Sequence, residues 1–232
     1  MFIDTETTGS EEEDRLCQVA FEWGALQVND LYKPPLPIST GAMAVHHITN
    51  RMVEDKPPFI GSYEYAILSA AKEDAVFVAH NAPFDLKMLA KEGLEFDKVI
   101  DTLKVIRYLD EAAKCESYSL QYLRYHCGME VEAQAHDAWG DILVLKELFK
   151  IMSEILMDRE ALDGPDDVID RMIAISAGPV PIVKFNFGKH KGKTVEEVAR
   201  EDRGYLGWLQ REKLKSPEGE EDWLYTLERV LK

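Results

Sequence analysis

Hydrophobic and polar residues alternate between two patterns along most of the chain. Compact apolar runs bounded by turn-forming residues predict strands at 2–5, 16–23, 25–31, 75–79 and 99–100. Apolar residues at helical spacing predict helices after Asn81 and at 63–72, 103–109, 120–127 and 137–156. Strands and helices in alternation indicate an α/β layer fold.

Prolines interrupt the pattern once in the first half. Pro34, Pro35 and Pro37 begin a segment that ends at Pro57 and Pro58. We expect it to be a long loop with short helical turns, because proline cannot continue a helix or a central strand. Loops of this length are often functional.

The composition changes after Met157, where acidic residues and Gly-Pro pairs replace the regular pattern. We therefore expect a domain at 1–157, a linker with one short helix at 158–182, and a smaller unit at 183–232. In that unit a glycine-punctuated basic segment predicts a hairpin, and Thr194-x-x-Glu197 is a capping box that opens a helix. About 50 residues are marginal for an independent core, so we expect the unit to pack on the first domain.

The charge balance restricts the function. The 232 residues include 27 Lys and Arg against 43 Asp and Glu, a net charge of −16, which argues against a protein that coats phosphate backbones. A local nucleic-acid site stays open, because carboxylates can bind divalent cations that invert the local charge. Apolar runs are too short for a membrane span, and the first residues lack the pattern of a signal peptide. We expect a cytoplasmic protein without a membrane partner.

Two carboxylates share one face of the first predicted strand. Asp4 and Glu6 are two residues apart, and side chains on a strand alternate between faces. Like charges this close raise each other's pKa unless a cation lies between them. Divalent Mg²⁺ or Mn²⁺ is the natural partner, since hard cations prefer oxygen ligands. An acidic turn after a strand is the plainer interpretation of such a pair alone.

Two further groups of polar residues strengthen the metal interpretation. Asp85 follows a buried strand and lies in the first turn of the next predicted helix, where the helix dipole favours an anion. His136 precedes the long helix and Asp141 lies in its first turns, so an imidazole and a carboxylate are expected close together. Each group alone is compatible with simple helix capping.

Together the three groups resemble the motifs of a known enzyme family. Residues 2–9 (FIDTETTG), 80–85 (HNAPFD) and 136–141 (HDAWGD) are similar, in order and spacing, to the three motifs of DEDDh exonucleases. The resemblance extends over about residues 1–157. It implies a ribonuclease-H-like fold, with a mixed sheet flanked by helices, and removal of nucleotides one at a time from 3′ ends.

The resemblance also implies roles for the site residues. Asp4, Glu6, Asp85 and Asp141 would hold two Mg²⁺ or Mn²⁺ ions, and His136 would be the general base that takes a proton from the attacking water. Two such ions can stabilise the attacking and leaving oxygens of a displacement at phosphorus, and a histidine pKa near 6.5 suits base catalysis at neutral pH.

The same family implies contacts to the substrate. Residues 42–49 (AMAVHHIT) are similar to the family's V-H-G-I-T loop, with His47 in place of the glycine. The substrate contacts implied by this loop and by the other motifs are Val45, His46, Thr7, His80, Asn81 and Phe84. A loop that simply packs on the core is the alternative for this segment.

The tail contains the chain's one basic patch. Lys189, Lys191 and Lys193 lie among aromatic residues in a stretch without acids, a combination that suits single-stranded nucleic acid. A hairpin whose phenylalanines face the core is an equally simple explanation. Residues 185–193 and 205–209 resemble the small α+β C-terminal module of exodeoxyribonuclease X-like proteins, which favours DNA as substrate and suggests that the three lysines contact it.

Three alternatives stay open. A 3′-to-5′ exoribonuclease would have the same fold and site. Asp4-x-Glu6-x-Thr8 also resembles haloacid-dehalogenase phosphatases, in which Asp4 would be the nucleophile, although that reading leaves His80 to Asp85 and His136 to Asp141 unexplained. A nucleic-acid-binding module without catalysis is the third. The preferred prediction is a metal-dependent 3′-to-5′ exonuclease acting on free 3′ ends, with single-stranded DNA favoured.

Overall fold

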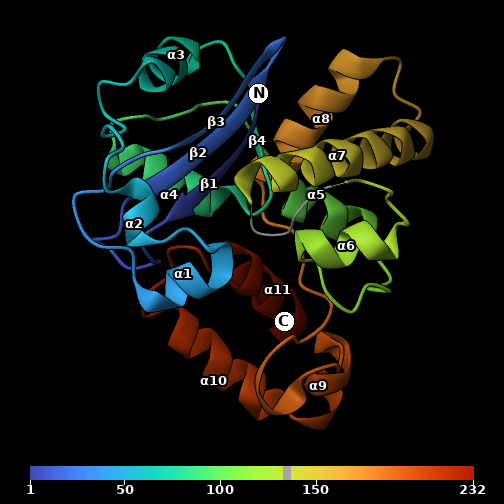
Figure 1. Ribbon diagram of the computed structural model, residues 1–232. Coiled ribbons are helices and arrows are strands. Elements are labelled where there is room, and N and C mark those ends of the chain that lie inside the picture. Colours follow the sequence, from blue (N-terminus) through green and yellow to red (C-terminus); the bar gives the residue numbers. More distant parts are fainter. Residues whose placement is uncertain (133–136) are drawn as a thin grey trace.

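The computed structural model describes residues 1–132 and 137–232. In these residues the centre of the fold is a five-stranded mixed sheet in the order β3-β2-β1-β4-β5 (Figure 1). The strands are β1 (Phe2–Thr7), β2 (Leu16–Trp23), β3 (Leu26–Leu31), β4 (Phe77–Ala79) and β5 (Val99–Asp101). β1, β2 and β3 pair antiparallel, whereas β4 runs parallel to both β1 and β5. The predicted strands and the mixed α/β fold are confirmed.

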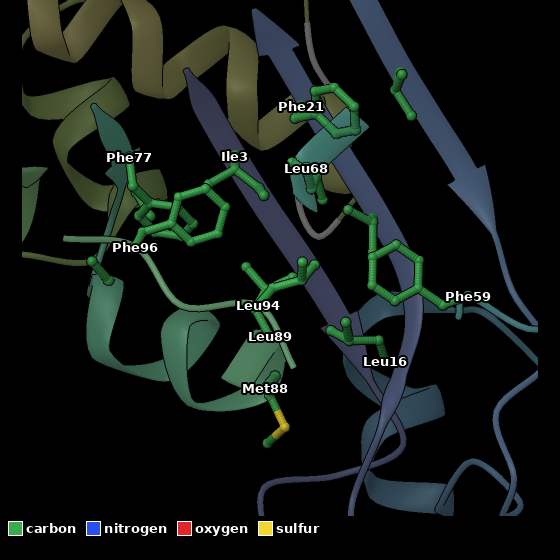
Figure 2. Packing of buried hydrophobic residues seen from close by; sticks show 14 of the residues in the cluster. Ile3, Leu16, Phe21, Phe59, Leu68, Phe77, Met88, Leu89, Leu94 and Phe96 are labelled. Carbon is green, nitrogen blue, oxygen red and sulfur yellow. The ribbon is translucent and has the colours of Figure 1, made fainter. Parts of the chain in front are cut away.

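One face of the sheet is covered by α3 (Tyr63–Ala71) and α4 (Ala82–Lys91). Ile3 of β1 packs there with residues of the neighbouring strands and both helices in one buried cluster (Figure 2). The cluster includes Phe21, Leu68, Phe77 and Leu89. Because side chains of a strand alternate between faces, burying Ile3 on this side turns Asp4 and Glu6 to the other.

The opposite face is covered by four helices. They are α5 (Thr102–Leu109), α6 (Leu120–His126), α7 (Ala138–Glu160) and α8 (Pro165–Ala177). The first turns of α7 lie against the sheet, where Ala138 and Ile142 contact Ala20 of β2. Among the described residues, no helix is both long enough and apolar enough to cross a membrane.

The segment expected to be a linker contains α8, a helix of 13 residues. Val168, Met172 and Ile175 of α8 are buried in the cluster that also contains Leu148 of α7. The short helix predicted within 158–182 is therefore present as α8. Its apolar stripe, with spacings of four and three residues, packs on the sheet.

The proline-bounded segment contains the short helices α1 (Thr40–His46) and α2 (Asn50–Val53), as predicted. His47, which ends α1, has a φ of 62°, in the left-handed region where glycine is easily accommodated. The histidine therefore keeps the conformation that a glycine at this place would adopt, at some steric cost.

The C-terminal module packs around its own buried cluster, which includes Phe185, Leu206, Trp223 and Leu227. Its elements are the 3₁₀ helix η1 (Gly188–His190), α9 (Val195–Glu201), α10 (Arg203–Lys213) and α11 (Glu221–Leu231). The capping box is confirmed, since Thr194 Oγ1 accepts from the Glu197 N–H at 3.1 Å. The predicted hairpin is reduced to one antiparallel bridge between Lys184 and Thr194, because Gly188 and Gly192 adopt positive φ angles and turn the chain between them.

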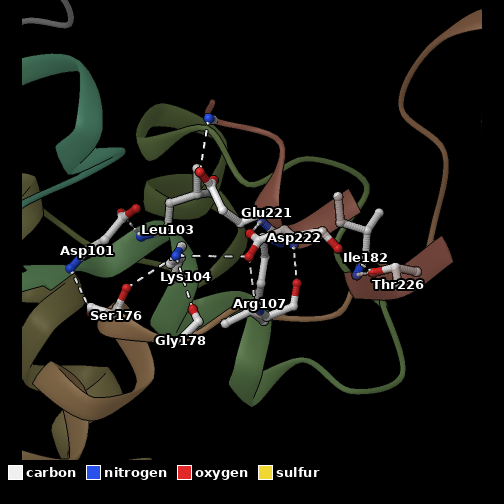
Figure 3. Close-up of polar contacts among 12 residues, drawn as sticks. Asp101, Leu103, Lys104, Arg107, Ser176, Gly178, Ile182, Glu221, Asp222 and Thr226 are labelled. Atoms are coloured by element: carbon white, nitrogen blue, oxygen red, sulfur yellow. Dashed lines mark hydrogen bonds and ion pairs between the residues drawn. The ribbon is translucent and has the colours of Figure 1, made fainter. Parts of the chain in front are cut away.

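The module is joined to the first domain by buried polar contacts around Asp222 of α11 (Figure 3). Arg107 Nη1 of α5 donates to Asp222 Oδ2 at 2.8 Å, and the Val180 N–H donates to Asp222 Oδ1 at 2.8 Å. The Arg107 and Asp222 side chains are 16% and 15% exposed, and the Ile182 N–H donates to Thr226 Oγ1 at 2.8 Å. The expected packing of the tail on the first domain is thus present. The exact division at 157 and 183 stays a prediction.

Candidate active site

Asp4 and Glu6 lie on the face of β1 that α7 covers. Their partners on β2 are Ala20 and Gln18, and Ala20 packs against Ala138 and Ile142 of α7. Both acids are partly buried, whereas Thr5 between them is buried on the opposite face. The register shifts after Glu6, and such irregularities end strand pairing next to many active sites.

The loop after β1 is closed by Asp14. Thr8 Oγ1 donates to Asp14 Oδ1 at 2.6 Å, and the Glu11 N–H donates to Asp14 Oδ2 at 2.7 Å. A β-carbon on Gly9 would come within 2.4 Å of the Asp14 carboxylate, so a larger residue here would displace the carboxylate that closes the loop. The acidic run therefore includes one residue that builds the loop beside the site.

Asp141 reaches the same place from α7. Asp137 caps this helix by accepting from the Gly140 N–H at 3.2 Å, which puts Asp141 in the first turns, against the sheet. Each of Asp4, Glu6 and Asp141 offers a carboxylate oxygen, and these three oxygens lie within 4.8 Å of one another. Three of the four predicted carboxylates therefore converge.

Asp85 lies in the first turn of α4, next to this group. Thr5 Oγ1 donates to Asp85 Oδ1 at 2.7 Å, so β1 orients this carboxylate from its other face. Asn81 precedes the helix with a φ of 68° and makes no side-chain capping bond. The helix predicted after Asn81 is confirmed, and Asn81 enters it with a left-handed backbone, which asparagine tolerates.

The carboxylates of this site carry like charges and lie close together, which raises their pKa values. Burial, followed by the charges of Asp141 and Asp85, raises the pKa of Glu6 to about 8. Burial, followed by Asp85 and Glu6, raises the pKa of Asp4 well above its usual range. Burial also raises the pKa of Asp85 to about 7, against the hydrogen bond from Thr5. Without a cation, this arrangement disfavours its own charged form.

The donor set fits a divalent metal. All the converging atoms are carboxylate oxygens, the ligands that Mg²⁺ and Mn²⁺ prefer. A bound cation would relieve the repulsion that raises these pKa values. The residues present therefore match the metal that the sequence analysis predicted.

His136, the predicted base, lies outside the described residues, which resume at Asp137. Asp137 itself raises the pKa of both Asp4 and Glu6. The role of His136 stays a prediction.

The residues predicted to contact substrate near α1 include one exposed side chain and two buried ones. Val45 is 50% exposed and can meet a ligand. His46 is 6% exposed, its Nδ1 accepts from the Ile48 N–H at 3.0 Å, and its Nε2 lies 3.1 Å from the Thr7 carbonyl oxygen. His46 therefore holds the loop against β1. Thr7 is also buried, and its hydroxyl donates to the Gly9 carbonyl at 2.6 Å.

The contacts predicted around α4 divide in the same way. The Asn81 side chain is exposed, whereas Phe84 packs against the core of Figure 2. Both ring nitrogens of His80 face protein atoms, Nδ1 at 2.9 Å from Thr102 Oγ1 and Nε2 at 2.7 Å from the Tyr118 carbonyl oxygen. Burial lowers the pKa of His80, so a neutral ring ties β4 to the segment before α6.

Two of the three predicted tail lysines are engaged within the module. Lys189 pairs with Asp202 at 2.7 Å and lies over the Tyr205 ring, and Lys193 pairs with Glu201. Among the described residues, no carboxylate lies within ion-pair distance of Lys191, which is exposed.

The sequence analysis missed two residues that touch the carboxylates. Thr5 lies inside the first motif, and alternation along β1 could have assigned it to the far face. Gln121 Nε2 donates to Asp141 Oδ1 at 2.5 Å. It belongs to α6, twenty residues from its partner, and no pattern in the sequence points to it.

Comparison with known sequence families gives two matches. The family described as "Exonuclease", of the RNase T type, matches residues 1–149. The family described as "Exodeoxyribonuclease X-like C-terminal" matches residues 185–212. The first covers the sheet and the carboxylates, and the second covers η1, α9 and most of α10.

Individual proteins agree with this assignment. Exodeoxyribonuclease 10 of Escherichia coli K12 is 31% identical over 182 residues, which cover 78% of this chain and 76% of that protein. A structure of exonuclease X in complex with 5′ overhanging duplex DNA is 26% identical and has a TM-score of 0.53, covering 74% of this chain and 98% of that one. E. coli exonuclease I in complex with a dA16 oligonucleotide shares the fold at a TM-score of 0.55 and 18% identity, over 79% of this chain and 46% of that one.

These matches decide between the classes of protein left open by the sequence. The phosphatase alternative is overturned, because the residues it needed belong to the matched exonuclease region. The sheet, the converging carboxylates and both matched regions lead to one conclusion: this chain belongs to the RNase T/DEDDh family of exonucleases.

Proposed function

We propose that the protein is a metal-dependent exonuclease that removes nucleoside monophosphates from the 3′ ends of DNA. The observation that carries the proposal is the convergence of Asp4, Glu6 and Asp141, whose ligand oxygens lie within 4.8 Å of one another. DNA is favoured because the relatives include an exodeoxyribonuclease and an exonuclease X bound to duplex DNA with a 5′ overhang. A 5′ overhang leaves a recessed 3′ end on the other strand.

In this proposal Asp4, Glu6, Asp85 and Asp141 hold two Mg²⁺ or Mn²⁺ ions. Bound there, the ions supply Lewis-acid stabilisation of the negative charge that develops on the phosphate. Thr5 keeps Asp85 in place through its 2.7 Å hydrogen bond. His136 accepts a proton from the attacking water, whose oxygen forms the new bond to phosphorus as the bond to the 3′ oxygen breaks.

The end of the substrate would meet the α1 loop. Val45 is 50% exposed beside the buried His46, so the terminal nucleotide can pack on its side chain. His46 and Thr7 act indirectly, because their polar atoms hold the loop and the end of β1 together. The exposed Asn81 side chain, just before α4, offers a polar contact.

A degradation time course tests this function. Single-stranded DNA and RNA of one sequence, labelled at the 5′ or the 3′ end, are incubated with Mg²⁺, Mn²⁺ or EDTA. The expected result is a ladder of shortening 5′-labelled DNA and immediate release of the 3′ label, both dependent on metal. The variants Asp4→Asn and His136→Ala should lose this activity, whereas Asp97→Asn, an exposed acid on another loop, should keep it. Faster shortening of RNA would identify an exoribonuclease, and no shortening of either strand would overturn the proposal.

We also propose that the C-terminal module contacts the nucleic acid. Support comes from the exposed Lys191 and from the side chains of Phe187 and Trp208, which are 37% and 46% exposed. Exposed rings can stack on bases while a lysine meets phosphate. Because Lys189 and Lys193 have carboxylate partners, we propose Lys191 as the lysine that meets phosphate.

Binding of a labelled single strand to the Asp4→Asn protein, followed by anisotropy at several salt concentrations, tests this contact. Lys191→Gln should reduce the slope of log K against log salt by about 0.7, and Trp208→Ala should weaken binding about tenfold. Lys193→Gln, the matched control, should change neither. Unchanged binding in both test variants would show that the module does not contact the strand.

A further inference from the structure

Gln121 connects α6 to the proposed metal ligand on α7. Its Nε2 donates to Asp141 Oδ1 at 2.5 Å. The two helices are packed together by buried residues, among them Leu123 of α6 and Val144 of α7. This packing fixes the position of α6, and with it the backbone of Gln121. α6 itself begins at Ser119, whose hydroxyl accepts from the Tyr122 N–H at 3.4 Å.

The orientation of this amide is set by Arg124. Arg124 Nη1 donates to Gln121 Oε1 at 3.4 Å, one helical turn further along. The same guanidinium donates through Nη2 to the Val131 carbonyl oxygen and lies 5.5 Å from the Tyr125 ring centre. Arginine has only donors, so the Gln121 oxygen must face it, and the NH₂ group must face Asp141.

The hydrogen bonds therefore run in one direction, from Arg124 through Gln121 to Asp141. The donor from Gln121 holds Asp141 Oδ1 in one direction, within the group of carboxylate oxygens that it forms with Asp4 and Glu6. It also fixes the plane of a carboxylate that shares a ligand group with those two acids. Partners behind a metal ligand commonly tune its affinity in this way.

We propose that Gln121 is a positioning residue that orients Asp141 for a divalent cation, with Arg124 holding Gln121 in the productive orientation. The inference rests on the proposed function, because it assumes that Asp141 is a metal ligand. The effect falls on the affinity for the ion rather than on the proton transfer, since Gln121 touches the ligand and not the reacting atoms.

Titration of the purified full-length protein with Mn²⁺, without nucleic acid, tests the inference. Isothermal calorimetry gives the Mn²⁺ dissociation constant of wild type, Gln121→Leu and Gln121→Glu. We expect Gln121→Leu to weaken Mn²⁺ binding about 10- to 100-fold. Nuclease assays at rising Mn²⁺ should then restore most of kcat, because the reacting groups are intact. Gln121→Glu should also weaken binding, because it keeps the size of Gln121 but has no N–H to donate to Asp141 Oδ1.

Gln27→Leu is the matched control. Gln27 Nε2 also donates to a carboxylate, that of Glu22 at 3.0 Å, but Glu22 lies outside the ligand group. Its Mn²⁺ affinity should equal that of wild type. In addition, Gln121→Leu combined with Arg124→Met should bind Mn²⁺ no more weakly than Gln121→Leu alone, since the two residues act in series.

Three results would contradict the inference. Wild-type Mn²⁺ affinity in Gln121→Leu, with binding lost in Asp4→Asn, would leave the metal site in place and remove Gln121 from it. Independent, additive losses from the two changes would separate Arg124 from Gln121. A wild-type protein that binds no Mn²⁺ would overturn the proposed function together with this inference.

Discussion

The acidic cluster of the site and the C-terminal module differ in how their charged side chains are paired. Among the described residues no lysine or arginine pairs with Asp4, Glu6 or Asp85, and the pKa of Glu6 is raised to about 8 by burial and its acidic neighbours. In the module, Lys189 and Lys193 each have a carboxylate partner. Unpaired charged side chains at a partly buried site indicate that a ligand binds there. Ion pairs within a module indicate a structural role.

The composition of the two regions shows the same difference. Residues 1–182 contain 16 Lys and Arg against 33 Asp and Glu, whereas residues 183–232 contain 11 against 10. The basic patch that stood out in the sequence is therefore balanced by nearby acids once the module folds. The acidic cluster is not balanced, and this comparison leads to four predictions.

The largest expected effect comes from removing a charge at the unbalanced site. Asp4→Asn should reduce nuclease activity by about a thousandfold or more, because a metal site contributes several kcal/mol to the transition state. The same variant should be more stable than the wild type in EDTA, since burial and like charges disfavour Asp4 in its charged form. Steady-state kinetics and thermal unfolding measure the two effects. Loss of both activity and stability would show that Asp4 is needed for folding and would contradict the comparison.

A paired charge in the module should behave in the opposite way. Asp222→Ala removes the carboxylate partner of Arg107 in a place where both side chains are about 15% exposed (Figure 3). We expect a loss of about 3 kcal/mol in the free energy of unfolding, measured in urea. Asp222→Asn keeps an acceptor for the Val180 N–H, which donates at 2.8 Å, and should lose less. Equal stability of all three proteins would mean that this contact does not hold the module.

The third effect is the response of the site to pH and metal. The folded-state pKa of Glu6, about 8, lies above the usual unfolded value of about 4.3. Between these values the folded protein binds more protons than the unfolded chain, so stability should fall as the pH rises from about 4 to about 8. Saturating Mn²⁺ should restore about 2 to 3 kcal/mol at pH 8.

Unfolding in urea at pH 5.5 and pH 8, in EDTA and in Mn²⁺, measures this response. The double variant Asp4→Asn with Glu6→Gln is the control, because it removes two of the three acids of the site whose pKa is raised and relieves the repulsion on the third, Asp85. It should lose most of the pH dependence and the response to Mn²⁺. The same pH slope in wild type and control would place the titrating groups elsewhere in the protein.

The comparison also explains which parts of the molecule could be predicted. The strands and the main helices follow from alternation and helical spacing, which are local patterns. The convergence of Asp4, Glu6 and Asp141 was expected from the resemblance of the three motifs to those of DEDDh exonucleases. The helix within 158–182 was also predicted, but its packing on the sheet was not, because the acids around Val168 gave the segment the composition of a linker. Gln121 is joined to Asp141 only by the packing of α6 on α7, and no local pattern records a contact of that kind.

Local sequence patterns also could not give the roles of several predicted residues. His46 and His80 were assigned to substrate because of their motifs, yet their ring nitrogens face Thr7, Ile48, Thr102 and Tyr118. A motif gives the position of a histidine but not the partners of its nitrogens. In the tail, the acids that pair with Lys189 and Lys193 lie in α9 or between α9 and α10, outside the stretch that looked uniformly basic.

The smallest expected effect comes from an exposed ion pair of the module. Lys193 and Glu201 are 45% and 54% exposed, so water screens their attraction, and Lys193→Gln should leave the melting temperature unchanged. Asp202→Ala should lower it measurably, because Asp202 accepts from Lys189 at 2.7 Å, lies 3.1 Å from His190 Nε2 and caps α10 through the Tyr205 N–H. Thermal unfolding of both variants decides whether pairing alone, or pairing combined with helix capping, stabilises the module. An equal fall in both would show that even exposed pairs matter here.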